Sequence, residues 1–123
     1  MSARILIVDD DQTVCSLFSL DCETRGSDVY VNAVASGDEA IVAIERLQPQ
    51  VLVLDLRMAK GDGFHVLEHL KAIGSTMPVV VVTNYKNDAY VERCKEYGVR
   101  DYIIKHEQPM RRIVDTVHAY LPA

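Results

Sequence analysis

The chain has 123 residues, a formal net charge of -5 and 49% hydrophobic residues. This length fits one domain, expected to span residues 1–123, and excludes a second sizeable core. The acidic balance and the lack of a tract rich in Lys and Arg argue against direct nucleic-acid binding by this domain. No apolar segment approaches membrane-spanning length, so we expect no membrane partner. The three cysteines form no C-x-x-C pattern, which favours buried thiols in the reducing cytoplasm over a disulfide framework.

Short runs of Val, Ile and Leu alternate along the chain with longer amphipathic stretches, which is typical of a βα-repeat domain. The apolar runs predict strands near residues 4–8, 29–33, 51–54, 79–82 and 101–104. The third and fourth runs lack polar alternation, as expected for central parallel strands that helices cover on both faces.

Apolar residues at helical spacing predict helices in the intervals between the strands and after the last one. The expected apolar stripes are Val14, Leu17, Phe18 and Cys22; Ala40, Ile41, Ile44 and Leu47; Val66, Leu67, Leu70 and Ile73; Val91, Cys94 and Tyr97; and Ile113, Val114, Val117 and Leu121. A capping box at 36–39 predicts that the second helix spans 37–47. Gly98 is placed to end the fourth helix, and Pro109 fits the first position of the fifth. The pattern predicts an α/β fold, a doubly wound parallel sheet of five strands with five helices and right-handed crossovers.

Polar residues follow four of the five predicted strands directly. They are Asp9, Asp10 and Asp11 after the first strand, Asp55 after the third, Thr83 after the fourth and Lys105 after the fifth. In an open parallel sheet, the carboxyl ends of the strands form the edge where ligands bind. Each residue alone is explained by a solvated loop or a cap, but their recurrence at consecutive strand ends indicates one site.

The residue types at these ends point to phosphoryl chemistry with a divalent cation. Carboxylates of Asp9, Asp10 and Asp55 are hard oxygen ligands in a number suited to Mg²⁺, while Asp11 is expected to cap the first helix. A carboxylate beside Mg²⁺ can act as a nucleophile on phosphorus and form an acyl phosphate. The hydroxyl and ammonium groups at the last two strand ends can donate to the oxygens of the transferred group.

With these residues at its strand ends, the chain resembles a known family, the receiver domains of two-component response regulators. It is similar in size and layout to the chemotaxis receiver. The resemblance covers essentially the whole chain. The motifs that carry it are Val8-Asp9-Asp10, Asp55-Leu56-Arg57-Met58 leading to Gly61-Asp62-Gly63, Val82-Thr83, and Gly98 through Tyr102 to Lys105. The resemblance implies a flavodoxin-like strand order of 2-1-3-4-5, with five helices on two faces of the sheet.

The resemblance also implies a role for each matching residue. Asp55 is the expected phosphoacceptor, and Asp10, Asp55 and the backbone carbonyl of Arg57 are the expected Mg²⁺ ligands, with Asp9 assisting through water. Thr83 and Tyr102 are the expected switch pair.

In biological terms, the family's donor is a phosphohistidine on a sensor histidine kinase or a phosphotransfer protein, and its target is a downstream protein or output domain that the sequence does not identify. Such a chain is a phosphoprotein in signal transduction rather than a conventional enzyme, with slow self-dephosphorylation at most.

Three positions depart from the usual family pattern. Ala59 stands where proline commonly follows the methionine, which should loosen that loop. Asn84 replaces a small residue after the switch threonine, where its bulk is expected to crowd the phosphate entrance. His106 replaces the proline that normally follows the lysine, so we predict a trans Lys105-His106 peptide bond. Arg57, Asn84 and Tyr85 are expected at the rim of the phosphate site, where bulky side chains can limit the access of water.

Two other functions remain open at this level. Asp9-Asp10-Asp11-Gln12-Thr13 also reads as the D-x-D-x-T nucleophile motif of haloacid-dehalogenase-type phosphatases, in which Asp9 attacks and Asp11 is the acid/base. The chain lacks the paired downstream acids of that class and is short for it. The other alternative is a receiver-like adaptor that binds partners without phosphorylation.

Overall fold

The computed structural model describes residues 2–26, 28–58 and 62–122, so the predictions that involve Ala59 and Gly61 lie outside the described residues. Within these ranges, five parallel strands form one sheet in the order β2-β1-β3-β4-β5. The strands are β1 (Ala3–Val8), β2 (Val29–Val34), β3 (Val51–Leu54), β4 (Val79–Thr83) and β5 (Asp101–Ile104). This order confirms the predicted doubly wound sheet.

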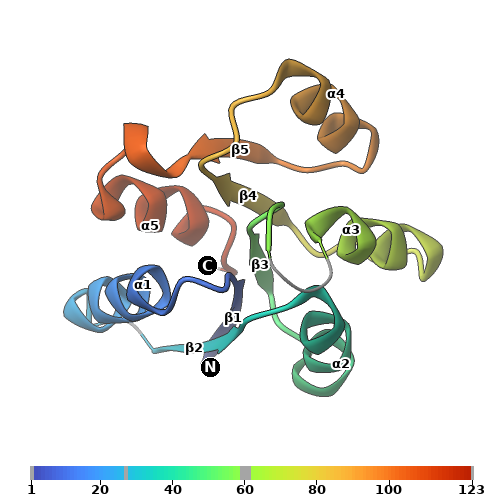
Figure 1. Ribbon diagram of the computed structural model, residues 1–123. Coiled ribbons are helices and arrows are strands. Elements are labelled where there is room, and N and C mark those ends of the chain that lie inside the picture. The colour runs from blue at the N-terminus through green and yellow to red at the C-terminus, as the bar shows by residue number, and fades with distance from the viewer. Residues whose placement is uncertain (1, 27, 59–61, 123) are drawn as a thin grey trace.

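Five α-helices cover the two faces of the sheet (Figure 1). They are α1 (Gln12–Thr24), α2 (Gly37–Leu47), α3 (Gly63–Ala72), α4 (Asp88–Glu96) and α5 (Met110–His118), and a 3₁₀ turn, η1 (Lys105–Glu107), follows β5. Helices α1 and α5 pack on one face, whereas α2, α3 and α4 pack on the other. No helix in the described part of the chain is long and apolar enough to cross a membrane.

The central strands divide their side chains between two hydrophobic cores. In β1, Ile5 and Ile7 face α1 and α5, whereas Leu6 and Val8 face the other three helices. This alternation follows from the period of two of a β-strand. Because both faces are covered, every residue of β3 and β4 is buried, which explains the apolar runs 51–54 and 79–82.

Local signals set the helix ends much as predicted. Ser36 Oγ accepts a hydrogen bond from the Glu39 amide at 3.2 Å, and α2 spans the predicted 37–47. Gly98 follows Tyr97, the C-cap of α4, and adopts a φ of +78°, a conformation that favours glycine and ends the helix. Asp11 caps α1, since its carboxylate accepts hydrogen bonds from the amides of Thr13 and Val14.

Several details of the helix predictions were wrong. Leu17 and Ile73 belong to predicted apolar stripes but are 49% and 54% exposed. Leu17 lies on α1 outside the buried arc of that helix, and Ile73 is the C-cap residue that follows α3. Pro109 is the N-cap of α5 rather than its first residue. Leu121 lies beyond the end of α5 and packs against the core from the C-terminal tail.

Candidate phosphoryl-acceptor site

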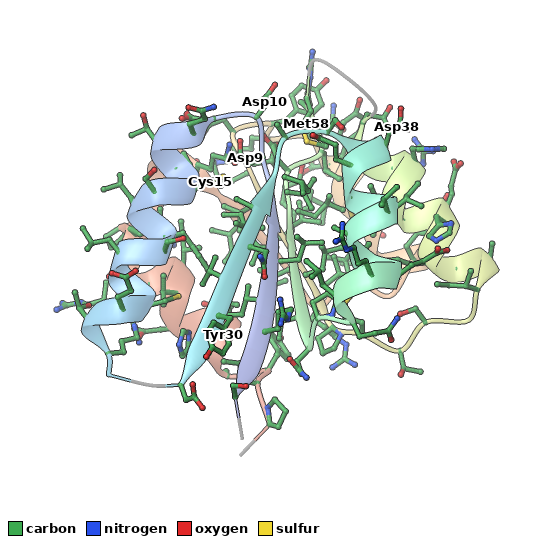
Figure 2. All side chains as sticks on the ribbon, turned by 90° about the horizontal axis from the view of Figure 1, so that it is seen from below. Asp9, Asp10, Cys15, Tyr30, Asp38 and Met58 are labelled. Atoms are coloured by element: carbon green, nitrogen blue, oxygen red, sulfur yellow. The ribbon has the colours of Figure 1, made fainter. Side chains whose placement is uncertain are left out.

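The acidic residues meet at the carboxyl ends of β1 and β3. These strands are hydrogen-bonded neighbours with Val8 beside Leu54, so the next residues, Asp9 and Asp55, are brought together. Their exposed fractions are only 4% and 5%, whereas Asp10 is exposed. One carboxylate oxygen from each of the three residues lies within 4.8 Å of the others. In Figure 2, Asp9 and Asp10 lie at the same end of the sheet, and Tyr30 lies at the opposite end.

Lys105 neutralises part of this negative charge. It follows β5, and its Nζ lies 2.6 Å from Asp9 Oδ2 and 3.0 Å from Asp55 Oδ2. Burial acts to lower the pKa of Lys105, but its hydrogen bonds and ion pairs with the two carboxylates outweigh burial and raise it. Lys105 is therefore held as a cation between the two acids.

The donor set fits a hard divalent cation. Three carboxylates against one ammonium leave a net negative charge at the site. Burial raises the pKa of Asp9, with a further contribution from the negative charge of Asp55, although hydrogen bonds from Lys105 and the Asp11 amide oppose the rise. The Arg57 amide donates to Asp55 Oδ1 at 3.2 Å, which places the backbone of the fourth predicted ligand beside the cluster. Oxygen ligands and residual negative charge are what Mg²⁺ prefers in proteins.

A pocket of about 300 Å³ opens beside Asp55. Its lining consists of Asp55, Arg57, Thr83, Asn84, Tyr85 and Lys105. All six were predicted site residues, so the fold unites three separate strand ends in one cavity. Thr83 is the last residue of β4 rather than the first residue after it, and its buried Oγ1 accepts a hydrogen bond from the Tyr85 amide at 3.3 Å.

The predicted rim residues contact each other. The Arg57 guanidinium lies over the Tyr85 ring at 4.5 Å from its centroid. Tyr85 also contacts Tyr90 of α4, whose ring centroid is 4.6 Å from that of Tyr85. Tyr90 was not predicted from the sequence, because nothing in its spacing on α4 distinguishes it from an ordinary core residue.

Tyr102, the second predicted switch residue, contacts the loop after Thr83. Its hydroxyl donates a hydrogen bond to the backbone carbonyl of Tyr85 at 2.5 Å. Burial raises the pKa of Tyr102 to about 12, and nearby ionisable groups add to the shift. The phenol therefore remains a neutral donor and ties β5 to the segment that leaves β4.

Asn84 and His106, which both differ from the usual family pattern, contact each other. No cis peptide bond occurs among the described residues, which confirms the trans bond predicted before His106. The chain turns directly into η1, and the His106 amide donates to Asn84 Oδ1 at 3.1 Å. The ring Nδ1 of His106 lies 3.1 Å from the same oxygen. Both residues stand out in the sequence, but their contact was not predicted. It could have been suspected because two unusual polar residues lie just beyond the ends of neighbouring strands.

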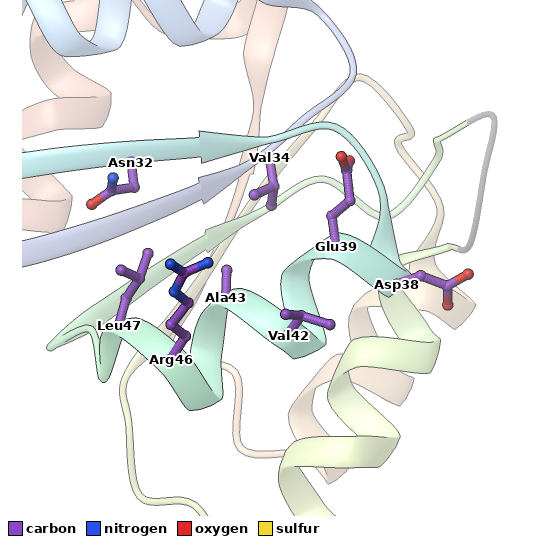
Figure 3. Close-up of a pocket in the computed structure, with 8 residues that line it drawn as sticks. All are labelled: Asn32, Val34, Asp38, Glu39, Val42, Ala43, Arg46 and Leu47. Atoms are coloured by element: carbon purple, nitrogen blue, oxygen red, sulfur yellow. The ribbon is translucent and has the colours of Figure 1, made fainter.

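A larger groove, of about 640 Å³, lies away from this site between β2 and α2 (Figure 3). Its walls include Asn32 and Val34 of β2 and Val42, Arg46 and Leu47 of α2. The groove lacks the convergence of buried acids and a buried lysine that marks the smaller pocket. We therefore assign the chemistry to the pocket at Asp55.

Comparison with known proteins agrees with this geometry. Residues 5–118 match the model of the response regulator receiver domain family. The DNA-binding response regulator MtrA of Mycolicibacterium paratuberculosis is 32% identical over 98% of this chain and 52% of its own length. The C4-dicarboxylate response regulator DctR of Halalkalibacterium halodurans is 28% identical over 83% of this chain and 44% of its own. This chain thus spans about half the length of these curated relatives.

A solved structure extends the likeness to three dimensions. The signal receiver domain of a Luxo repressor protein from Vibrio parahaemolyticus superimposes with a TM-score of 0.88, at 22% identity, over 98% of this chain and 90% of the other. This likeness concerns the fold, while the family match concerns the sequence that carries the acidic pocket. The chain belongs to the receiver-domain family of the response regulators of two-component systems.

Proposed function

We propose that Asp55 accepts a phosphoryl group from a phosphohistidine on a sensor histidine kinase or a phosphotransfer protein. One observation carries the proposal: Asp55 lines the 300 Å³ pocket while its Oδ2 lies 3.0 Å from Lys105 Nζ. A buried carboxylate held beside a fixed cation suits a reaction that brings a negatively charged phosphoryl group to the carboxylate, because the cation can bind the oxygens of that group.

In the transfer, an oxygen of the Asp55 carboxylate attacks phosphorus. The phosphorus–nitrogen bond of the donor breaks, and its electron pair stays on the imidazole nitrogen. Lys105 and Thr83 donate hydrogen bonds to the oxygens of the moving group. The proposed ligands of Mg²⁺ are Asp9, Asp10, Asp55 and the Arg57 carbonyl. An ion bound there would neutralise part of the negative charge of the phosphoryl group.

The response to phosphorylation is proposed to run from Thr83 to Tyr102. Thr83 Oγ1 now accepts from the Tyr85 amide, and a hydroxyl drawn toward a phosphoryl group would weaken that contact. Tyr102 holds the carbonyl of the same residue, Tyr85, so it would sense the change. We propose that the affected surface comprises α4, β5 and α5, and that a downstream protein or output domain binds there.

We further propose that residues 1–123 act as one receiver domain in the cytoplasm, with no direct nucleic-acid contact and with slow self-dephosphorylation at most. The net charge of -5 and the three free, buried cysteines support this setting.

Incubation with acetyl phosphate and Mg²⁺, followed by intact-mass spectrometry, tests the proposal. We expect one labile phosphoryl group per chain in the wild type and none in Asp55→Asn, which removes the nucleophilic charge at nearly constant volume. Asp38→Asn, an exposed change on α2, is the matched control and should behave as wild type. Equal uptake by Asp55→Asn would move the nucleophile elsewhere, first to Asp9. No uptake by the wild type would favour the adaptor, and steady release of phosphate would favour the phosphatase.

A further inference from the structure

Asn84 is a polar side chain at the pocket to which the proposed reaction gives no role. Asn84 lines the cavity together with Asp55, Thr83 and Lys105. The sequence suggests only that its bulk crowds the site. The structure adds that the side chain is held from outside the pocket, by the turn that follows Lys105.

The hydrogen bonds to His106 fix which way the Asn84 carboxamide faces. A backbone amide can only donate, so the atom that it contacts at 3.1 Å must be the carboxamide oxygen. The ring Nδ1 lies 3.1 Å from the same oxygen, so it must carry a proton to be attracted to it. Both contacts engage Oδ1, which leaves the two N–H groups of Nδ2 for other partners.

The contact depends on both unusual residues at once. Proline at position 106 would have neither an amide hydrogen nor an imidazole, and a small aliphatic residue at position 84 would have no acceptor. The 3₁₀ turn at Lys105–Glu107 presents the His106 amide directly after the lysine that contacts Asp55. Asn84 and His106 therefore act as one unit beside the reacting carboxylate.

We propose that Asn84 donates a hydrogen bond through Nδ2 to the phosphoryl group as it is transferred to Asp55, and that His106 is the positioning residue that holds the carboxamide for this role. The inference rests on the proposed phosphoryl transfer to Asp55 and adds a donor to Thr83 and Lys105. The ligand that Asn84 recognises is a tetrahedral phosphoryl group. Holding Oδ1 beforehand lowers the entropy that the side chain loses when Nδ2 binds.

The test is the second-order rate constant of phosphoryl uptake from acetyl phosphate with saturating Mg²⁺. We expect Asn84→Ala to slow uptake by about threefold to tenfold, the effect of one lost hydrogen bond. If Asn84 only crowds the pocket, the smaller side chain admits the donor more easily and uptake becomes faster. The sign of the change therefore decides between the two roles, and faster or unchanged uptake overturns the proposal.

The role of His106 is tested by a double-mutant cycle. His106→Pro removes both donors and should slow uptake, His106→Ala keeps the amide and should have a smaller effect, and His106→Asn places a carboxamide near the position of Nδ1 and should restore part of the rate. In the Asn84→Ala background, His106→Pro should cost nothing more, because His106 acts only through Asn84. An equal, independent loss in both backgrounds overturns the positioning role.

Two controls separate the possible failures. His65→Ala removes an exposed histidine on α3 and should leave the rate unchanged. Thermal melting of each variant identifies loss of folding, and Asn84→Ala, an exposed change, serves if His106→Pro does not fold. Absence of uptake by the wild type would overturn the proposed function and this inference together. Normal wild-type uptake, with Asn84→Ala and His106→Pro both as fast as the wild type, would overturn the inference alone.

Discussion

Lys105 shows how a single side chain makes an unfavourable cluster tolerable. Asp9 and Asp55 are almost fully buried, and two carboxylates at this range repel each other. The ammonium contacts both of them, at 2.6 Å and 3.0 Å. Its own desolvation is unfavourable, yet the raised pKa of Lys105 indicates that the paired attraction is larger. The same contacts place a cation where a phosphoryl group would arrive.

Arg57 and Tyr85 allow a prediction about the lifetime of phospho-Asp55. Their stacked side chains line the pocket beside the acceptor and are expected to hinder the in-line approach of water. Arg57→Ala combined with Tyr85→Ala should therefore shorten the lifetime roughly fivefold, which corresponds to about 1 kcal/mol in the barrier to hydrolysis. The decay of the phosphorylated species, followed by mass spectrometry after removal of the donor, measures this.

A matched control exists in the same molecule. Arg93 lies over the Phe64 ring at 3.9 Å, an equivalent stack that does not line the pocket. Arg93→Ala should leave the lifetime of phospho-Asp55 unchanged. A double mutant at Arg57 and Tyr85 whose phosphoryl group lasts as long as that of the wild type, or longer, contradicts the protective role.

At the level of elements, the sequence predicts the central strands β3 and β4 well, because burial on both faces leaves a run of apolar residues without polar alternation. The ranges 51–54 and 101–104 match β3 and β5, and β4 extends the predicted range by one residue to Thr83. The exposed positions Leu17 and Ile73 were mispredicted, since apolar spacing alone says neither how far a neighbouring layer reaches nor where a helix ends.

In the candidate site, too, some features were predictable from the sequence and others were not. Asp9, Asp55, Thr83 and Lys105 were predictable because strand order alone brings their strand ends to one edge. The contacts of Tyr102 with the Tyr85 carbonyl and of His106 with Asn84 were not predictable. They depend on the paths of loops, and loop geometry has no periodic pattern in the sequence.

The start of α3 leads to a prediction about how a helix positions the acceptor. Gly63 is the first residue of α3, and its amide donates to the Leu56 carbonyl at 3.1 Å. A methyl group on Gly63 would lie 2.7 Å from the carbonyl oxygen of Asp55 and 2.8 Å from Cα of Leu56, so the backbone must shift. Gly63→Ala should lower the free energy of unfolding by about 1 to 3 kcal/mol and slow phosphoryl uptake. Urea denaturation and the uptake assay measure the two effects.

Gly98 provides the contrast for this variant. It has a φ of +78° and no atom within 4 Å of an added methyl group, so Gly98→Ala strains the backbone without displacing a neighbour. We expect it to lower stability by about 1 kcal/mol and to leave the uptake rate unchanged. Normal uptake by a folded Gly63→Ala protein would show that the closeness of α3 to Asp55 does not matter for the reaction.

For the molecule as a whole, three thiols and one phenol connect stability to alkaline pH. Burial raises the pKa of Cys15, Cys22 and Cys94 to about 11 each, from an ordinary value of 9.0, and that of Tyr102 to about 12. Above pH 9 the folded chain therefore holds these protons more tightly than the unfolded chain, and stability falls as pH rises. Each thiol should contribute roughly 2 to 3 kcal/mol that is lost between about pH 9 and 11.

Urea unfolding at pH 8 and pH 11 measures this loss. The variant Cys22→Ala with Cys94→Ala should be less stable than the wild type at pH 8, because it leaves cavities, but should lose less stability on going to pH 11. A wild-type free energy of unfolding that stays constant over this range would contradict the expected linkage.

Metal binding should also be visible as a property of the whole fold. A cation that binds only the folded chain stabilises it by mass action, by about 2.7 kcal/mol at a hundredfold excess over Kd. We therefore expect the melting temperature to be several degrees higher in saturating Mg²⁺ than in EDTA. Asp10→Asn should reduce this difference, whereas Asp38→Asn, which is not part of the cluster, should retain it. Identical melting curves of the wild type in the two conditions would refute the metal site.

The bridge from Lys105 to Asp9 and Asp55 joins the last strand to the first and the third. During synthesis, the two acids leave the ribosome well before the lysine that compensates them. An incomplete chain therefore has the nucleophile without its cation, and the reactive site forms only when β5 joins the sheet. We therefore expect competence for phosphoryl uptake to arise late in synthesis, only after β5 has been made and has joined the sheet.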